Sequence, residues 1–181
     1  GWFEADAFHL VNDLPGVLYG PLWPVMQLGN LLVGPAVAIV AAVFRRWRLA
    51  IAALGVTVSK LVLERVVKDL VVRRRPASVL TDVNLRHAPT GGQAFVSGHL
   101  VLIAGLAAIV TPYLRGRWKV VPWVLVFLVG FGRTYVGAHT PLDVIGGTGL
   151  GLAIGGLANL IVGVPARGQM SSWWRSDRRA R

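Results

Sequence analysis

The sequence contains no cysteine and carries little charge. Without cysteine, disulfide bonds, thiolate catalysis and zinc sites with cysteine ligands are excluded. Charged residues make up 15% of the 181 residues, whereas a soluble globular domain carries about 25%. The mean hydropathy is +0.59 and the hydrophobic residues gather in long blocks, so the composition favours a chain embedded in a lipid bilayer.

Acidic residues are scarce as well: 8 Asp and Glu stand against 19 Lys and Arg, which gives a formal net charge of +11. A protein this basic is first considered as a nucleic-acid binder. Most of its basic residues, however, flank the apolar blocks, as membrane anchoring requires, and no basic stripe alternates with aromatic residues. We therefore expect the bilayer to be a partner of this chain and nucleic acid not to be one.

Five apolar blocks are long enough to cross the hydrocarbon layer, which takes about 20 helical residues. Because backbone polar groups in lipid must bond to one another, each block is predicted to be a helix. The sequence thus predicts an all-α, polytopic transmembrane helix bundle with spans at about residues 24–44, 49–72, 98–114, 120–136 and 141–164. Residues 1–23 are predicted to form an amphipathic segment at the membrane interface, and residues 165–181 a basic cytoplasmic tail.

The basic residues also give the predicted helices a direction. Most of them lie in two connections and the tail, at residues 45–48, 115–119 and 165–181. By the positive-inside rule this side is cytoplasmic, and the chain is predicted to be a multi-pass protein of the cell membrane. The N-terminal segment then starts outside, which leads us to expect a sixth helix upstream of Gly1.

Three polar clusters fall on the predicted extracytoplasmic side, at residues 68–76, 97–99 and 133–143. They lie at the end of the second span, the start of the third, the end of the fourth and the start of the fifth. Because successive spans run in opposite directions, these four helix ends meet at one face of the membrane. Topology alone therefore predicts a single site built from all three clusters.

The residues of this site suit the binding and transfer of a phosphoryl group. Guanidinium groups bind phosphate oxygens in bidentate fashion, and a lysine adds a point charge. Ser97 and Gly98 open a predicted helix, where free backbone N–H groups favour an anion. The candidate phosphate ligands are therefore Lys68, Arg75, Ser97, Gly98 and Arg133.

Two histidines and an aspartate supply nucleophilic and acid–base chemistry. His99 and His139 carry imidazoles that can attack or donate a proton near neutral pH. Asp143 lies four residues after His139, so its carboxylate can accept a hydrogen bond from one imidazole nitrogen and leave the other free to attack. Together with three cations, these groups can transfer a phosphoryl group without a metal, so we expect neither metal nor cofactor.

The ordered motifs Lys-x6-Arg-Pro, Ser-Gly-His and Arg-x5-His-x3-Asp resemble those of the type 2 phosphatidic acid phosphatase (lipid phosphate phosphatase) superfamily. The motifs cover residues 68–143, and the helical frame extends the resemblance over about residues 24–164. The resemblance implies that His139 is the nucleophile and forms a phosphohistidine. It further implies that Asp143 orients this histidine and that His99 protonates the leaving oxygen.

The expected activity is hydrolysis of a phosphomonoester or diphosphate of an amphiphilic lipid at the extracytoplasmic face. The abundance of Arg, Ala, Val and Gly is typical of a GC-rich bacterial genome. In a bacterium a polyprenyl carrier of the cell envelope is the favoured lipid, as its phosphate or diphosphate; a phosphatidate-like lipid comes next. The alternatives are a phosphotransferase with another acceptor, a non-catalytic lipid-phosphate binding or transport protein, and a vanadate-dependent peroxidase, although those enzymes are soluble. The oligomeric state is left open.

The remaining polar residues receive structural interpretations. Lys60, Glu64 and Lys68 are spaced four apart, so Glu64 is predicted to neutralise its neighbours. Arg73 and Arg74 are interpreted mainly as interface anchors, with contact to substrate as the alternative. The glycines of residues 146–156 are interpreted as a helix-packing surface.

Overall fold

The computed structural model describes residues 2–164, and all regular elements in this range are helical. The helices are α1 Trp2–Asn12, α2 Tyr19–Met26, α3 Val33–Val43, α4 Trp47–Leu70, α5 Gly98–Val110, α6 Val121–Tyr135 and α7 Pro141–Val162. The prediction of an all-α fold is confirmed for these residues, where the only β-type pairing is one isolated bridge between Arg74 and Gln93. The predicted basic tail lies outside the described residues.

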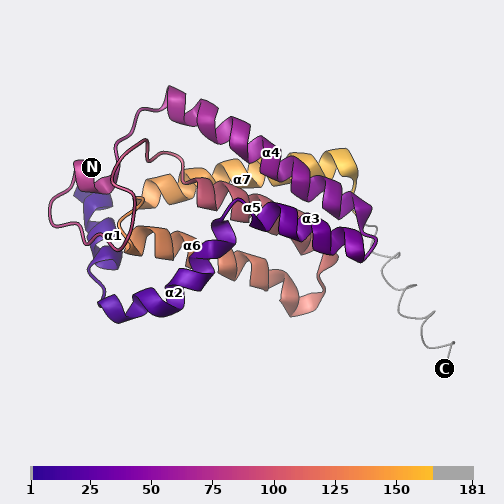
Figure 1. Ribbon diagram of the computed structural model, residues 1–181, viewed down its shortest axis with the longest axis horizontal. Helices are drawn as coiled ribbons and strands as arrows, with labels where there is room; N and C mark the ends of the chain where they lie inside the picture. The colour runs from indigo at the N-terminus through magenta and orange to yellow at the C-terminus, as the bar shows by residue number, and fades with distance from the viewer. Residues whose placement is uncertain (1, 165–181) are drawn as a thin grey trace.

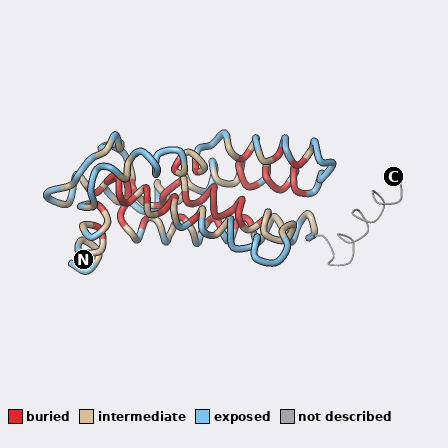
Figure 2. Tube along the Cα trace, turned by 90° about the horizontal axis from the view of Figure 1, so that it is seen from below, coloured by how far each residue is buried: buried red, intermediate tan, exposed pale blue. Residues whose placement is uncertain are grey.

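Helix α5 forms the centre of an elongated bundle (Figure 1). All of its residues from Leu100 to Ala107 are buried, as expected for a helix that is hydrophobic on every side. Helices α3, α4, α6 and α7 run along it, and their buried residues face inward while exposed apolar residues face outward (Figure 2). Exposed side chains such as Ile51, Val58 and Leu160 suit contact with lipid.

The number of membrane spans remains a prediction. Among residues 2–164, helix α7 is long and apolar enough to cross a membrane by itself, and the bent pair of Gly16–Gly29 and Val33–Val43 is a second candidate. The other predicted spans correspond to helices α4, α5 and α6, whose starts lie within two residues of the expected positions.

The first predicted span, residues 24–44, is wrong as a single continuous helix. The chain bends by 68° between the two halves of this block. Asn30 adopts an extended conformation, and its Oδ1 accepts a hydrogen bond from the backbone N–H of Leu32 at 3.2 Å, which competes with helical pairing. Just before the bend, Gly29 lies against His99: a Cβ on Gly29 would lie 2.6 Å from the Cβ of His99.

The predicted packing role holds for one face of α7, where Gly147, Gly151 and Gly155 lie against the start and middle of α5. A Cβ on Gly151 would lie 2.5 Å from the backbone oxygen of Val101, whereas a Cβ on Gly149, on another face of the helix, would meet nothing within 4 Å. The absence of side chains lets the two backbones approach closely. This contact places the start of α5 beside the start of α7, where two of the three polar clusters lie.

Candidate active site

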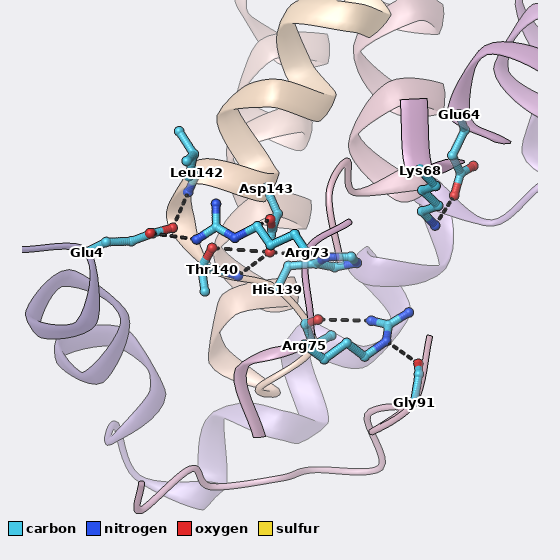
Figure 3. A network of polar contacts seen from close by, with 11 residues as sticks. Glu4, Glu64, Lys68, Arg73, Arg75, Gly91, His139, Thr140, Leu142 and Asp143 are labelled. Atoms are coloured by element: carbon cyan, nitrogen blue, oxygen red, sulfur yellow. Dashed lines mark hydrogen bonds and ion pairs between the residues drawn. The ribbon is translucent and has the colours of Figure 1, made fainter. Parts of the chain in front are cut away.

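The predicted convergence of the three clusters is present at one end of the bundle. The N–H of Ser97, before α5, donates to the backbone oxygen of Asp143 in α7 at 3.1 Å. A guanidinium nitrogen of Arg75, Nη1, donates to the backbone oxygen of Ala138 at 3.0 Å. The connection that follows α4 and the starts of α5 and α7 therefore meet in one place (Figure 3).

His139 and Asp143 are buried together at this end, with 3% and 0% of their surfaces exposed. The Nδ1 atom of His139 lies 3.7 Å from Oδ2 of Asp143, close enough for an ion pair but longer than a hydrogen bond. The same Oδ2 accepts hydrogen bonds from the backbone N–H of Thr140 at 2.9 Å and from its hydroxyl at 3.2 Å. This capping box fixes the carboxylate, and in catalytic sites such contacts often tighten only when substrate binds.

Several buried polar atoms in this region lack a hydrogen-bond partner among the described residues. They include the hydroxyl of Ser97, the Nε of Arg133, the Nδ1 of His139 and the Oδ1 of Asp143. Buried polar atoms are normally paired, so unpaired ones call for an explanation. The hydroxyl of Ser97 and the Nε of Arg133 can donate to a phosphate, with its many acceptor oxygens, whereas the Nδ1 of His139 faces the carboxylate of Asp143.

The predicted histidine pair is also brought together. His99 in α5 lies close enough to His139 and Arg133 for their charges to act on it. Arg75 likewise acts on His139, so two of the three predicted cations surround the nucleophile candidate. Their roles in chemistry remain predictions.

Lys68 is held by a carboxylate next to the site. Its Nζ forms an ion pair of 2.5 Å with Glu64, which also pairs with Lys60 at 2.8 Å, so the predicted neutralisation is confirmed. The carboxylate of Glu64 lies at the start of α5, since a Cβ on Gly98 would come within 2.4 Å of its oxygens. Direct binding of phosphate by Lys68 therefore requires it to leave or share this partner.

Sequence reasoning missed the position of Arg73, which is more than an interface anchor. Its Nη2 forms an ion pair of 2.6 Å with Glu4 of α1, and its Nε lies 3.6 Å from Oδ1 of Asp143 (Figure 3). No sequence signal could reveal this arrangement, because Glu4 and Arg73 are 69 residues apart and belong to no common motif.

An apolar cavity of about 340 Å³ lies farther along α5. Side chains of α3, α5 and α6 line it, among them Val37, Ile103, Leu106 and Leu125, and Trp118 lies at its far end. Its lining also includes Leu28, the residue before the glycine that touches His99. Most of its lining, from Ile103 of α5 to Trp118 and Val121, lies towards the end of the bundle opposite the polar site.

Comparison with known proteins places this chain in a family. The family model of the PAP2 superfamily matches residues 32–165. An undecaprenyl-diphosphatase of Sulfolobus acidocaldarius is 29% identical over 159 residues, which cover 82% of this chain and 73% of that protein.

Two solved structures share the fold. The crystal structure of LpxE from Aquifex aeolicus superposes with a TM-score of 0.78 at 27% identity and covers 84% of this chain and 92% of that one. A transmembrane PAP2-type phosphatidylglycerolphosphate phosphatase from Bacillus subtilis superposes with a TM-score of 0.73 at 22% identity and covers 87% of this chain and 83% of that one.

Proposed function

This chain belongs to the PAP2 superfamily and is a lipid phosphatase of that type, and we propose that it removes phosphate from a polyprenyl phosphate or diphosphate through a phosphohistidine on His139. The observation that carries the proposal is the buried pair of His139 and Asp143 beside unpaired donors on Ser97 and Arg133. Such a set of groups can bind a phosphate and place the imidazole nucleophile next to its phosphorus.

The proposed reaction has two steps. In the first, Nε2 of His139 attacks phosphorus, the bond from phosphorus to the leaving oxygen breaks, and His99 gives that oxygen a proton. In the second, water attacks the phosphorus of the phosphohistidine and loses a proton to His99, while the bond from phosphorus to Nε2 of His139 breaks and phosphate is released. Asp143 keeps the proton on Nδ1 of His139 in both steps, while Arg75 and Arg133 balance the charge on the phosphoryl oxygens.

The apolar cavity supports a substrate with a long hydrocarbon tail. It is lined entirely by apolar side chains, and one of them, Leu28, precedes the glycine that lies against His99. A lipid whose phosphate occupies the polar site needs a tail long enough to run along α5 to reach it. The name of the Sulfolobus acidocaldarius relative, undecaprenyl-diphosphatase, favours a polyprenyl chain over a diacylglycerol.

We also propose that the site faces the extracytoplasmic side. The turn between α3 and α4, which contains Arg45 and Arg46, and the connection from α5 to α6, which contains Arg115 and Lys119, lie at the opposite end of the bundle (Figure 1). Basic connections of this kind mark the cytoplasmic side.

A phosphate-release screen tests the proposed activity. We expect the purified protein in detergent to release phosphate from polyprenyl monophosphate or diphosphate faster than from phosphatidate or phosphatidylglycerolphosphate. The reason is that the apolar cavity along α5 suits part of a long hydrocarbon tail. Equal rates on all tailed substrates would contradict the substrate preference, and no release from any of them would contradict the phosphatase itself.

Two additions to this screen test how the phosphoryl group is transferred and which molecule accepts it. Vanadate should inhibit, because it mimics the trigonal-bipyramidal geometry of phosphoryl transfer, and EDTA should leave the rate unchanged if the reaction needs no metal. An assay that follows the phosphoryl group into added alcohols or lipids separates hydrolysis from phosphotransfer. Phosphate that appears mainly on an acceptor would identify a phosphotransferase.

The pH dependence should reflect the burial of His139. Burial is the largest influence and lowers the pKa of its imidazole from 6.5 to about 4; the nearby carboxylate of Asp143 opposes this shift, and the charges of Arg133 and Arg75 add to it. The imidazole attacks only when unprotonated, so kcat/KM should be retained from neutral pH downward and be lost as the pH falls towards about 4. The measurement is a kcat/KM profile corrected for ionisation of the substrate phosphate. A kcat/KM profile that falls on the acid side with a midpoint near pH 6.5 would contradict this expectation.

A further inference from the structure

Helix α1 reaches the catalytic pair through one ion-paired arginine. The carboxylate of Glu4 contacts Nη2 of Arg73 at 2.6 Å, and Nε of the same guanidinium lies 3.6 Å from the otherwise unpaired Oδ1 of Asp143. Arg73 thus links Glu4 to the carboxylate that faces His139 (Figure 3). Neither the family motifs nor the proposed mechanism uses Glu4 or Arg73.

Glu4 has a second contact with the segment that carries the catalytic pair. Its Oε1 accepts a hydrogen bond from the backbone N–H of Leu142, in the first turn of α7, at 3.3 Å. Burial raises the pKa of the Glu4 carboxyl, but the nearby hydroxyl of Thr140, the hydrogen bond from Arg73 and the charge of Arg73 outweigh it, so the pKa lies below its usual value. The carboxylate is therefore ionised at neutral pH, and its charge suits the N-terminus of a helix.

The helix that carries Glu4 is firmly docked. Phe8 is fully buried, and the side chain of Asn12 donates to the backbone oxygens of Tyr135 and Asn84 at 2.9 and 3.0 Å. Arg86 donates to the backbone oxygens of Asn12 and Tyr135 at 2.9 and 2.7 Å. These buried contacts fix α1 against the end of α6, so Glu4 has a defined position from which to hold Arg73.

We propose that Glu4 is a positioning residue for the catalytic pair, because it holds Arg73 against Asp143 and the first turn of α7. The inference rests on the proposed function, in which Asp143 orients His139. Without Glu4, the flexible arginine has no partner on its outer side and leaves the 3.6 Å contact for solvent or for the substrate phosphate. The carboxylate of Asp143 then keeps only the contacts of Thr140 with Oδ2, and it orients the imidazole less firmly.

The alternative is that this ion pair only attaches α1 to the bundle. Attachment alone would change stability and would affect binding and chemistry together. Positioning of Asp143 instead affects the chemical steps, while the cations that bind phosphate stay in place. The ratio of effects on kcat and KM therefore separates the two roles.

The first experiment compares Glu4→Gln with Asp6→Asn on a polyprenyl phosphate. Asp6 is an exposed residue on the same helix, so its substitution makes the same change in charge without touching Arg73. We expect Glu4→Gln to lower kcat between about 10-fold and 100-fold with KM changed less than about 2-fold, as misplacement of a catalytic group does. Asp6→Asn should match the wild type, and an unchanged kcat in Glu4→Gln would overturn the inference.

A second variant tests the path through Arg73. Arg73→Lys keeps the charge but loses the planar group that contacts Glu4 and Asp143 together. We expect its kcat to fall as in Glu4→Gln, and the double variant to lose no more than either single one, since both act through the same contact. Losses that multiply in the double variant would contradict a common path.

A spectroscopic measurement keeps this inference separate from the proposed function. In protein labelled with ¹⁵N-histidine, the side-chain signals of His139, assigned by their loss in His139→Gln, should shift in Glu4→Gln and Arg73→Lys but not in Asp6→Asn. If the wild type releases no phosphate while these shifts occur, the proposed function fails and the positioning role stands. Signals that stay in place in both variants would overturn the positioning role, whatever the activity.

Discussion

Replacement of His139 by glutamine should abolish phosphate release and lower kcat by at least about four orders of magnitude, as loss of a catalytic nucleophile does. The imidazole is buried beside Asp143 and is the group that would carry the phosphoryl intermediate. Glutamine has a similar size and can hydrogen-bond, but its amide nitrogen is no nucleophile. The measurement is phosphate release from a polyprenyl phosphate, with detection of an acid-labile phosphoenzyme in the wild type and its absence in the variant.

A matched histidine outside the site controls this experiment. His9 lies in α1, 3.7 Å from the exposed carboxylate of Asp13, so His9→Gln should retain the activity of the wild type. Binding of the phospholipid to His139→Gln should also persist, because Arg75, Arg133 and Ser97 are unchanged. Turnover near the wild-type level in His139→Gln would favour the binding or transport alternative, and a phosphoenzyme that persists there would place the nucleophile elsewhere.

The convergence of the site could be predicted because it depends on features that are local in sequence. Each cluster lies at the end of an apolar block, and alternating helix directions bring such ends together. The structure agrees: Ser97 bonds to the backbone of Asp143, and Arg75 bonds to the connection that carries His139. The pairing within α4 was equally predictable, since a spacing of four residues places Lys60, Glu64 and Lys68 on one helix face.

The features that escaped prediction depend on contacts between distant residues. The bend near Asn30 lies within an apolar block that is long enough to be one span, so the sequence gives no reason to expect it. In the structure, Gly29 just before the bend lies against His99. The contact between Glu4 and Arg73 likewise needs the docked position of α1, which no periodicity reveals. The 3.7 Å separation of His139 and Asp143 is also invisible in sequence, because spacing fixes which residues can meet but not the remaining distance.

Substitution of Gly151 by alanine should lower the stability of the protein by about 1–3 kcal/mol, the usual cost of overpacking. The added Cβ would lie 2.5 Å from the backbone oxygen of Val101, 2.9 Å from the Cβ of Ala104 and 3.0 Å from the backbone nitrogen of Gly105. None of these atoms belongs to a flexible side chain, so α5 and α7 must move apart. The measurement is the apparent midpoint of thermal unfolding in detergent at a fixed scan rate, which should fall by about 5 °C.

Gly149→Ala is the matched control on the same helix, and it should shift the midpoint in the opposite direction. A Cβ there meets nothing within 4 Å, and alanine restricts the unfolded chain, which stabilises by up to about 1 kcal/mol. Separation of the two helices in Gly151→Ala should also reduce activity, because the N–H of Ser97 would lose its bond to Asp143. Equal midpoints for the two alanine variants would show that α5 and α7 are not in the close contact that places His99 beside the catalytic pair.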